Sequence, residues 1–257
     1  MASLFWSVRG PTLPGLPSRV VSLVPSVTES LHDLGTGQTV VGVTDYCIFP
    51  AEIPNDVLRV GGTKNPDVSR IKSLGPDLVY MNLEENLLRH AEQIERFTSV
   101  IVCEPKTVDH VLEMLTMFGR LHERVRWAEE WISRIRVEVP SGSEPSFRFA
   151  CPIWKDPWMW CGGDTYVSNL IATAGGRNVL EDLSRYPKLD PEVVISREPD
   201  LIFLPDEPFL FTEVDAQLVR SWSNAHVVGP FPGHLLTWHG TRTLQGLGFL
   251  RQQLASL

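Results

Sequence analysis

The stretch LGPDLVYMNLEEN, residues 74–86, nearly recurs further along the chain as EPDLIFLPDEP, residues 198–208. Each copy consists of a proline-aspartate pair, a short apolar run and an acidic cluster, and each follows a segment with a helical pattern. Internal similarity of this kind indicates two units that are built alike. We therefore predict two similar lobes, with a ligand cleft between them.

Strand-like and helix-like segments alternate around both copies. The apolar runs RVVSLVP (residues 19–25) and TVVGVT (residues 39–44) are rich in β-branched residues, which is typical of buried parallel strands. In the second half FRFACPIW (residues 147–154) and LIFLP (residues 201–205) have the same character. This rhythm predicts an α/β protein with right-handed βαβ units in each lobe, like a Rossmann fold.

The segment between the two halves has a different pattern. Apolar residues recur every three or four positions across residues 107–139, and no proline interrupts them. This periodicity predicts one continuous helix up to about 50 Å long. We thus predict an N-terminal α/β lobe over residues 19–106, a connecting helix over 107–139 and a C-terminal α/β lobe over 145–257.

Charge and composition restrict the partners and the compartment. A net charge of −8 without a long basic run argues against nucleic acid and anionic membrane surfaces. The first 20 residues lack the continuous apolar core of a secretory signal, and no stretch of about 18 apolar residues occurs. The four cysteines form no CxxC pair, as expected of reduced, buried thiols. We expect a cytoplasmic monomer, or a periplasmic or cell-surface protein if the true start lies elsewhere.

The sequence contains no recognisable catalytic constellation. The motifs GxSxG, HExxH and GxxxxGK[ST] do not occur. Of the seven histidines, His226, His234 and His239 lie near strand ends of the second half, and the other four lie in helical segments. A metal site needs several such ligands together. We therefore expect neither an enzyme nor a built-in metal or cofactor.

Four motifs resemble a known family in order and spacing: RVVSLVPSVTESLHDLG, VVGVTDYCIFP, VGGTKNPDVSRIKSLGPDLVYMNLEEN and DTYVSNLIATAGGRNVLED. They are similar to the helical-backbone substrate-binding proteins of ABC importers, in particular the cobalamin-binding branch. The resemblance implies two Rossmann-like lobes joined by a spanning helix. It also implies one corrinoid ligand, held without covalent chemistry. The same scaffold carries haem, iron chelates or metal ions in other members.

The ligand of an open α/β sheet binds outside the carboxyl ends of its strands. Applied to the strands predicted here, this rule selects the candidate ligand-binding residues Tyr46, Asn82, Glu85, Trp154, Lys155, Trp158, Glu207 and Trp238. Lys64, in the turn GGTKNP, is expected to line the cleft, and the resemblance adds Tyr186.

The segment IWKDPWMWCGGD, residues 153–164, is the most unusual part of this set. It holds three tryptophans within seven residues, and their broad faces suit a tetrapyrrole-like ligand. Strand alternation sends at least one of Trp154 and Trp160 into the core, so we predict that Trp158 faces the ligand. The resemblance places Tyr186 over the ligand, with a half-buried surface tyrosine as the alternative.

Two other functions stay open at this point. Haem carries two propionates and would need cations at its rim, for which Lys64, Lys155, Arg185 and Arg242 are available. A corrinoid has neutral amides at its rim, which Asn82, Glu85 and Glu207 could bind, and the acidic strand ends favour it. The chain could also be a sensor or partner-binding module that uses its tryptophan-rich edge and no small ligand.

The resemblance further implies docking to a membrane permease through one surface glutamate in each lobe. Glu192 occupies this position in the second lobe, whereas Ser69 occupies it in the first. A serine cannot form the charge-assisted pair with arginine that a glutamate forms. Together with the lack of a signal segment, this favours a cytosolic relative of the importers that does not dock onto a permease as they do.

Overall fold

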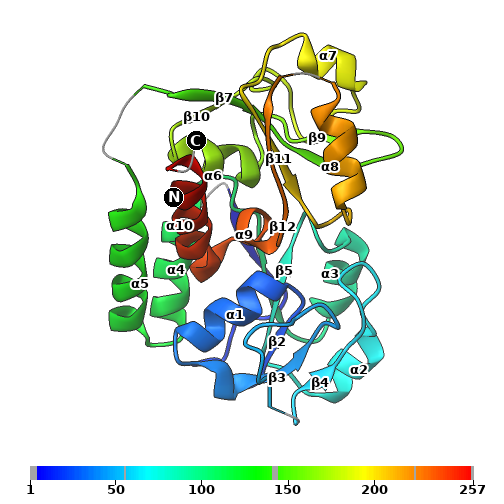
Figure 1. Ribbon diagram of the computed structural model, residues 1–257. Coiled ribbons are helices and arrows are strands. Elements are labelled where there is room, and N and C mark those ends of the chain that lie inside the picture. Colours follow the sequence, from blue (N-terminus) through cyan, green and yellow to red (C-terminus); the bar gives the residue numbers. More distant parts are fainter. Residues whose placement is uncertain (1–4, 55, 141–143, 223, 256–257) are drawn as a thin grey trace. The chain divides into compact units, whose positions relative to one another are not determined.

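The computed structural model describes residues 5–54, 56–140, 144–222 and 224–255. The chain divides into two compact units (Figure 1). Unit 1 comprises the chain up to Pro105, Asp109–Ser133 and His239–Arg242. Unit 2 comprises Lys106–Val108, Arg134–Trp238 and the chain from Thr243 onward. A short part of the second half of the sequence therefore belongs to unit 1.

Unit 1 is built on a six-stranded sheet with the order β1-β6-β5-β2-β3-β4. All neighbours pair in parallel except β1, which is antiparallel to β6 and precedes the predicted start of the lobe. The strands are β1 (Trp6–Arg9), β2 (Val20–Ser22), β3 (Val40–Val43), β4 (Leu58–Arg59), β5 (Leu78–Asn82) and β6 (Ser99–Cys103). The connecting helices are α1 (Pro25–Asp33), η1 (Gly37–Thr39), α2 (Val68–Ser73) and α3 (Leu88–Ile94).

The two faces of this sheet pack against different helices. On β5, Val79 and Met81 belong to a core cluster that includes Ile71 of α2 and Ala91 of α3. The intervening Tyr80 points the other way, as strand alternation requires, and its ring meets that of a phenylalanine on the helix that follows β6. Both faces are therefore buried, which explains the continuous apolar runs of these strands.

The predicted single helix over residues 107–139 is wrong. The segment forms two helices, α4 (Val108–Leu121) and α5 (Val125–Glu138), which lie side by side (Figure 1). The chain reverses at Glu123, whose φ of 52° is left-handed. A Cβ atom on Gly119 would lie 2.6 Å from the Cβ of Ala128, so the two helices approach closely there. Periodicity misses the break because Leu121 and Val125 keep helical spacing across it.

Unit 2 contains a parallel four-stranded sheet with the order β10-β7-β11-β12 and a separate antiparallel pair, β8 and β9. The strands are β7 (Phe147–Ala150), β8 (Pro152–Trp154), β9 (Met159–Trp160), β10 (Gly176–Asn178), β11 (Leu201–Pro205) and β12 (His226–Phe231). The helices are α6 (Tyr166–Thr173), α7 (Pro191–Ile195), α8 (Glu213–Arg220), α9 (His234–Thr237) and α10 (Thr243–Leu254), while η2 (Gly240–Arg242) belongs to unit 1.

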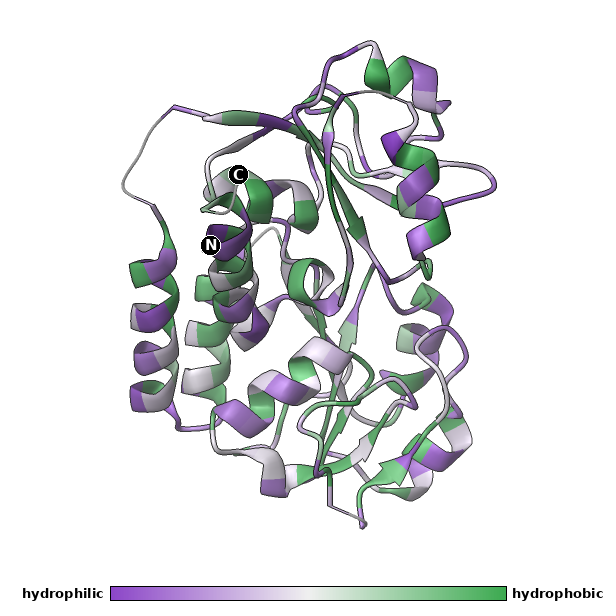
Figure 2. Cartoon of the chain, viewed as in Figure 1, coloured by the Kyte–Doolittle hydropathy of each residue, from purple (hydrophilic) through white to green (hydrophobic). Residues whose placement is uncertain are grey.

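Hydropathy follows this architecture within each unit. The strands of both sheets are mostly hydrophobic, whereas α5 and α8 carry hydrophilic and hydrophobic residues side by side (Figure 2). In unit 2, Ile202 and Leu204 of β11 share a core cluster with Val194 of α7 and Val219 of α8. A helix that buries one stripe and exposes the other is the expected cover for such a sheet.

The repeated proline-aspartate pair has the same structural role in both units. In unit 1, the backbone of Asp77 donates to Arg19 O at 3.0 Å, and its carboxylate accepts from Arg19 N at 3.1 Å. In unit 2, Asp200 N donates to Arg148 O at 2.8 Å, and its carboxylate accepts from Arg148 N at 2.6 Å. The guanidinium of each arginine donates to a carbonyl at the end of the preceding helix. The repeat thus fixes a helix-to-strand turn against the neighbouring strand.

Candidate functional site

The carboxyl edge of the unit 1 sheet exposes large apolar side chains. Tyr46, in the loop after β3, is 62% exposed, and Leu83, directly after β5, is 52% exposed. The Tyr46 ring lies over Gly62, where a Cβ atom would come within 3.3 Å of it. Lys64 lies in the next loop, between β4 and α2, and donates from Nζ to the carbonyl of Glu84. Tyr46 and Lys64 therefore lie at the edge that the strand-end rule selected.

Asn82 shapes this edge from within. Its side-chain oxygen accepts from Glu84 N at 2.7 Å and Glu85 N at 3.3 Å, while its backbone N donates to the side chain of Asn86 at 2.8 Å. Its amide nitrogen lies 3.2 Å from Nε2 of His239. The side chain is buried, so the prediction that Asn82 binds a ligand amide is corrected to a loop-forming role. Glu85 is half-buried in the loop that it forms.

His239 is buried beneath the same edge. Its ring nitrogens lie 3.4 Å from Oγ of Ser26, in addition to the contact with Asn82. Burial lowers the pKa of the imidazole to about 4, so the ring is neutral at neutral pH. A neutral histidine enclosed by a serine and an amide supports the packing of the loop.

Arg242 was a candidate cation for haem propionates, and the structure corrects this. Its guanidinium forms an ion pair with Glu29, in which Nε lies 2.9 Å from Oε2, and both side chains are at most 10% exposed. The guanidinium also lies 4.1 Å from the centre of the Phe49 ring. Since a buried charge is stable only with its partner, Arg242 remains committed to Glu29.

The tryptophan segment of unit 2 separates into an exposed and a packed part. Trp158 lies against Trp160, Phe211 and Trp222, with ring centroids 5.9, 5.7 and 4.9 Å away. This aromatic cluster joins the core of the unit. Trp158 is half-buried among these rings, which occupy much of its surface, so this packing argues against the prediction that it offers its face to a ligand. Trp160 is fully buried, as strand alternation allows.

Trp154 is the tryptophan that the structure exposes at this place. It is 41% exposed at the end of β8, and its ring meets the edge of Phe209 at 5.6 Å. Lys155 turns away from solvent and pairs with Asp215, with 2.7 Å between Nζ and Oδ1. Leu210, in the loop after β11, is 69% exposed. Leu210 was not among the predicted ligand-binding residues, although an apolar residue in a strand-end loop is a usable signal.

The remaining candidates of unit 2 differ in exposure. Glu207 follows β11 and accepts from the hydroxyl of Thr237 at 2.8 Å. Trp238 is buried and meets the His234 ring at 5.8 Å, which corrects its predicted place at the ligand. Tyr186 is half-buried, and the Arg185 guanidinium lies 5.7 Å from the centre of its ring. This exposure agrees with the alternative interpretation of Tyr186 as a half-buried surface tyrosine.

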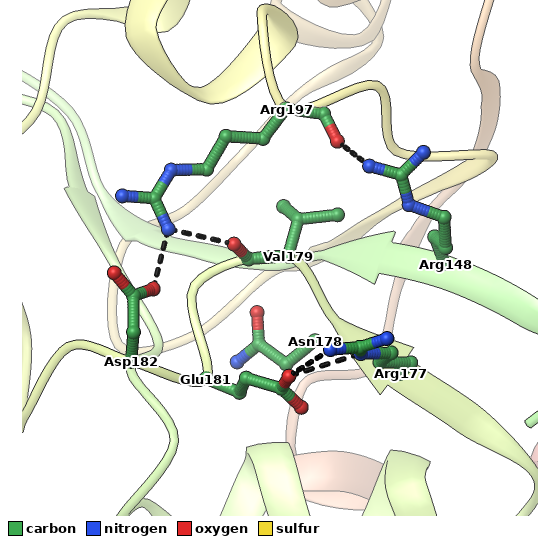
Figure 3. A pocket seen from close by; sticks show the side chains of 7 residues that line it. All are labelled: Arg148, Arg177, Asn178, Val179, Glu181, Asp182 and Arg197. Carbon is green, nitrogen blue, oxygen red and sulfur yellow. Dashed lines mark hydrogen bonds and ion pairs between the residues drawn. The ribbon is translucent and has the colours of Figure 1, made fainter.

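A second region of unit 2 is concave, and its arginines form ion pairs with carboxylates of the same unit. A cavity of about 400 Å³ is lined by Arg148, Arg177, Asn178, Val179, Glu181, Asp182 and Arg197 (Figure 3). The three arginines form ion pairs with Glu181, Asp182 and Glu198. The arginines that line the cavity are therefore already paired with carboxylates of the same unit. Among the described residues no group of histidines, cysteines and carboxylates is arranged to hold a metal ion.

Ser69 and Glu192 occupy the same position of equivalent short helices. Each is the second residue of its helix, after Asp67 at the start of α2 and Asp190 at the start of α7. Both are exposed. The Ser69 hydroxyl donates to the Asp67 carboxylate at 2.6 Å, so it is part of the helix cap. In the described ranges no helix is both long and apolar enough to span a bilayer.

Comparisons with known proteins agree with the resemblance. The family described as periplasmic binding protein matches residues 20–221. The vitamin B12-binding protein of Pectobacterium carotovorum subsp. carotovorum is 27% identical over 202 residues, covering 75% of this chain and 73% of that protein. The cobalamin-binding protein of Halobacterium salinarum is 28% identical over 204 residues, and the match covers 74% of this chain and 54%, about half, of that protein. A substrate-binding ABC transporter lipoprotein of Bacillus subtilis, itself uncharacterised, is 25% identical over 265 residues, covering 95% and 82%.

Solved structures share the fold at lower identity. The periplasmic vitamin B12-binding protein of Vibrio cholerae aligns with a TM-score of 0.75 and 20% identity over 95% of this chain and 98% of its own. The periplasmic heme-binding protein of Roseiflexus sp. RS-1 in its apo form aligns with a TM-score of 0.77 and 23% identity over 93% and 98%. These likenesses confirm the predicted two-lobed α/β class of fold.

The comparisons also overturn one expectation and confirm another. The cytoplasmic location is wrong, because the relatives and neighbours include a lipoprotein and periplasmic proteins, which point outside the cytoplasm. That expectation rested on the N-terminal residues and the free cysteines, which report the compartment less directly than the relatives do. The family resemblance is confirmed, because the match over residues 20–221 and the shared fold show that the chain belongs to the periplasmic binding protein family.

Proposed function

We propose that the chain binds a corrinoid, without catalysing a reaction on it, as the substrate-binding component of an ABC importer. The observation that carries this proposal is the exposure of large apolar side chains at the carboxyl edge of each sheet. Tyr46 and Leu83 provide it in unit 1, and Trp154 and Leu210 provide it in unit 2. Exposed apolar surface gathered at a strand edge is typical of a ligand site, and flat rings suit a macrocycle.

The charges at these edges favour a corrinoid over haem. Haem propionates need cations, yet Arg242 is committed to Glu29 and Lys155 to Asp215. Lys64 donates one of its three Nζ hydrogens to the carbonyl of Glu84, and the Arg185 guanidinium lies over the Tyr186 ring. A ligand whose rim consists of neutral amides requires none of these cations. The names of the curated relatives, vitamin B12-binding and cobalamin-binding, favour the same class of ligand.

Titration of the purified chain with cyanocobalamin, and separately with haemin, tests this proposal. We expect heat and a change of the absorbance spectrum with the corrinoid, at one ligand per chain. Removing the exposed face of Trp154 with Trp154→Ala should weaken binding about 5- to 150-fold, the equivalent of about 1–3 kcal/mol. Binding of haemin alone, or of neither ligand, would contradict the proposal.

Trp127→Ala is the matched control. Trp127, on α5, is also an exposed tryptophan, at 51%, and its ring lies close to Gly35. Gly35 precedes β3, so Trp127 lies away from the carboxyl edge of the sheet. Its removal should leave the corrinoid affinity unchanged. An equal loss in both variants would mean that Trp154 acts through the stability of the protein and not through contact with the ligand.

We also propose that Glu192 contacts an arginine of the importer's permease, and that Ser69 leaves the equivalent contact of unit 1 weaker. One charge-assisted contact of this kind contributes about 1.5–3 kcal/mol. Glu192→Ala should therefore lower the affinity for a solubilised corrinoid permease about 10- to 150-fold. Ser69→Glu should raise that affinity, and unchanged affinity in both variants would refute this mode of docking.

A further inference from the structure

Two of the four cysteines lie directly across from each other in unit 2. Cys151 immediately precedes β8, and Cys161 immediately follows β9. The antiparallel register pairs Pro152 with Trp160, so the next pair outward is Cys151 with Cys161. The backbone confirms this juxtaposition, because Cys161 N donates to Cys151 O at 2.9 Å.

The spacing of such a pair suits a covalent link. Residues of a hydrogen-bonded antiparallel pair have Cα atoms about 5.5 Å apart and side chains on the same face. Disulfides span Cα separations of about 5.5–6 Å. Both side chains are fully buried, and neither sulfur belongs to a disulfide in this structure. The other two cysteines belong to unit 1, where Cys47 contacts two threonine hydroxyls and Cys103 lies on β6.

We propose that Cys151 and Cys161 form a disulfide when the chain folds in an oxidising compartment. The thiolate of one cysteine attacks a disulfide of the oxidant, which is a glutathione or protein disulfide, and forms a mixed disulfide. The thiolate of the second cysteine then displaces the oxidant's remaining sulfur. The two cysteines lose two protons and two electrons, and the oxidant leaves as two thiols. Because both sulfurs become buried, the reaction takes place before the surrounding loop closes.

The compartment of the relatives supports this step. Periplasmic proteins and lipoproteins mature where disulfides form and persist, whereas cytosolic thiols stay reduced. A pair of unlinked, adjacent, buried thiols is the reduced form of such a site. The same pair would remain as two thiols if the chain were produced in the cytosol.

The link would also organise the proposed ligand edge. Residues 152–160 lie between the two cysteines and carry Trp154 at one strand end. A covalent bond at the base of this loop restricts its conformations in advance and so lowers the entropy that binding must remove. This consequence rests on the proposed corrinoid function, whereas the bond itself does not.

Thiol counting tests the bond. The full chain is refolded in a mixture of oxidised and reduced glutathione, denatured without reductant, alkylated and weighed by intact mass spectrometry. We expect two alkylated thiols and a mass lower by two hydrogen atoms, with the linked peptide containing Cys151 and Cys161. Four alkylated thiols would overturn the proposal.

Serine variants identify the pair. Cys151→Ser and Cys161→Ser should each give three alkylated thiols, whereas Cys47→Ser and Cys103→Ser should each give one. A single alkylated thiol in Cys151→Ser would show a different pairing and would overturn the assignment. Corrinoid affinity is measured in parallel on oxidised and reduced protein, and we expect the oxidised form to bind several-fold more tightly. Absence of binding by both forms would refute the proposed function, while the thiol count would still decide the disulfide.

Discussion

Acid should destabilise unit 1 through His122, a buried imidazole between α4 and α5. Its Nε2 lies 2.8 Å from the hydroxyl of Tyr80, on the central strand β5, and the side chain is almost fully enclosed. Burial disfavours the charged ring and lowers the pKa of His122 from 6.5 to about 4. In the unfolded chain the ring regains its ordinary pKa of about 6.5. Between these two values the unfolded state holds a proton that the folded state lacks.

The sign and size of the effect follow from this difference. When folding lowers the pKa of a group, the folded state has its full stability at pH values above the pKa that the group has in the unfolded chain. This stability is lost as the pH falls from that value through the pKa of the group in the folded chain. From pH 7 to pH 5, one group with these two pKa values lowers the free energy of unfolding by about 2 kcal/mol. His239 has a similarly lowered pKa of about 4 and adds a loss in the same direction.

Urea denaturation at pH 7 and pH 5, followed by circular dichroism and extrapolated linearly, measures this loss. In the His122→Gln variant the difference between the two pH values should shrink by about 2 kcal/mol, because glutamine does not titrate. The exposed His226→Gln variant should keep the wild-type difference. If His122→Gln shows the same pH dependence as the wild type, or if the protein gains stability toward acid, the assigned role of burial is refuted.

Three further outcomes are expected. Arg242→Met should lower the free energy of unfolding by about 3–5 kcal/mol, because it leaves the Glu29 carboxylate buried and unpaired. The double variant Glu29→Met with Arg242→Met should recover most of this loss. A double-mutant cycle that shows no coupling between the two residues would contradict the ion pair. Gly119→Ala should lower the free energy of unfolding by about 1–3 kcal/mol, and with it the thermal midpoint, because the new Cβ atom would collide with Ala128. Adding Ala128→Gly to this variant should restore the stability. Asp200→Ala should cost about 1–2 kcal/mol in urea unfolding by removing the acceptor for a strand-starting amide, and a neutral effect would argue against the turn described here.

Local chemistry was sufficient to predict the alternation of strands and helices. The apolar runs that became β2, β3, β5 and β11 are continuous because both faces of each sheet are covered, and that signal is present in the strand itself. The repeated proline-aspartate turns are also local, and Asp77 and Asp200 form the same backbone contacts in their units. The break between α4 and α5 escaped prediction because three residues can reverse the chain without disturbing the apolar period.

The candidate site was only partly predictable, because exposure depends on partners that are remote in sequence. Tyr46 and Trp154 lie at strand ends with exposed rings, as the strand-end rule requires. Trp158 packs against Phe211 and Trp222, which lie more than 50 residues further along the chain. No local pattern distinguishes a tryptophan that meets such neighbours from one that does not.

The class of fold, the repeated turns and the family could be predicted from the residues alone, because they depend on periodicity and on motifs whose spacing is preserved along the chain. Which charges are available to a ligand became clear only from the folded chain. Arg242 and Glu29 are separated by 213 positions, and their pairing follows from the return of His239–Arg242 to unit 1. Cys151 and Cys161 likewise became neighbours through strand pairing. The physical reason is that burial and charge pairing are set by the folded surroundings of a side chain, and a residue's type and its sequence neighbours do not specify those surroundings.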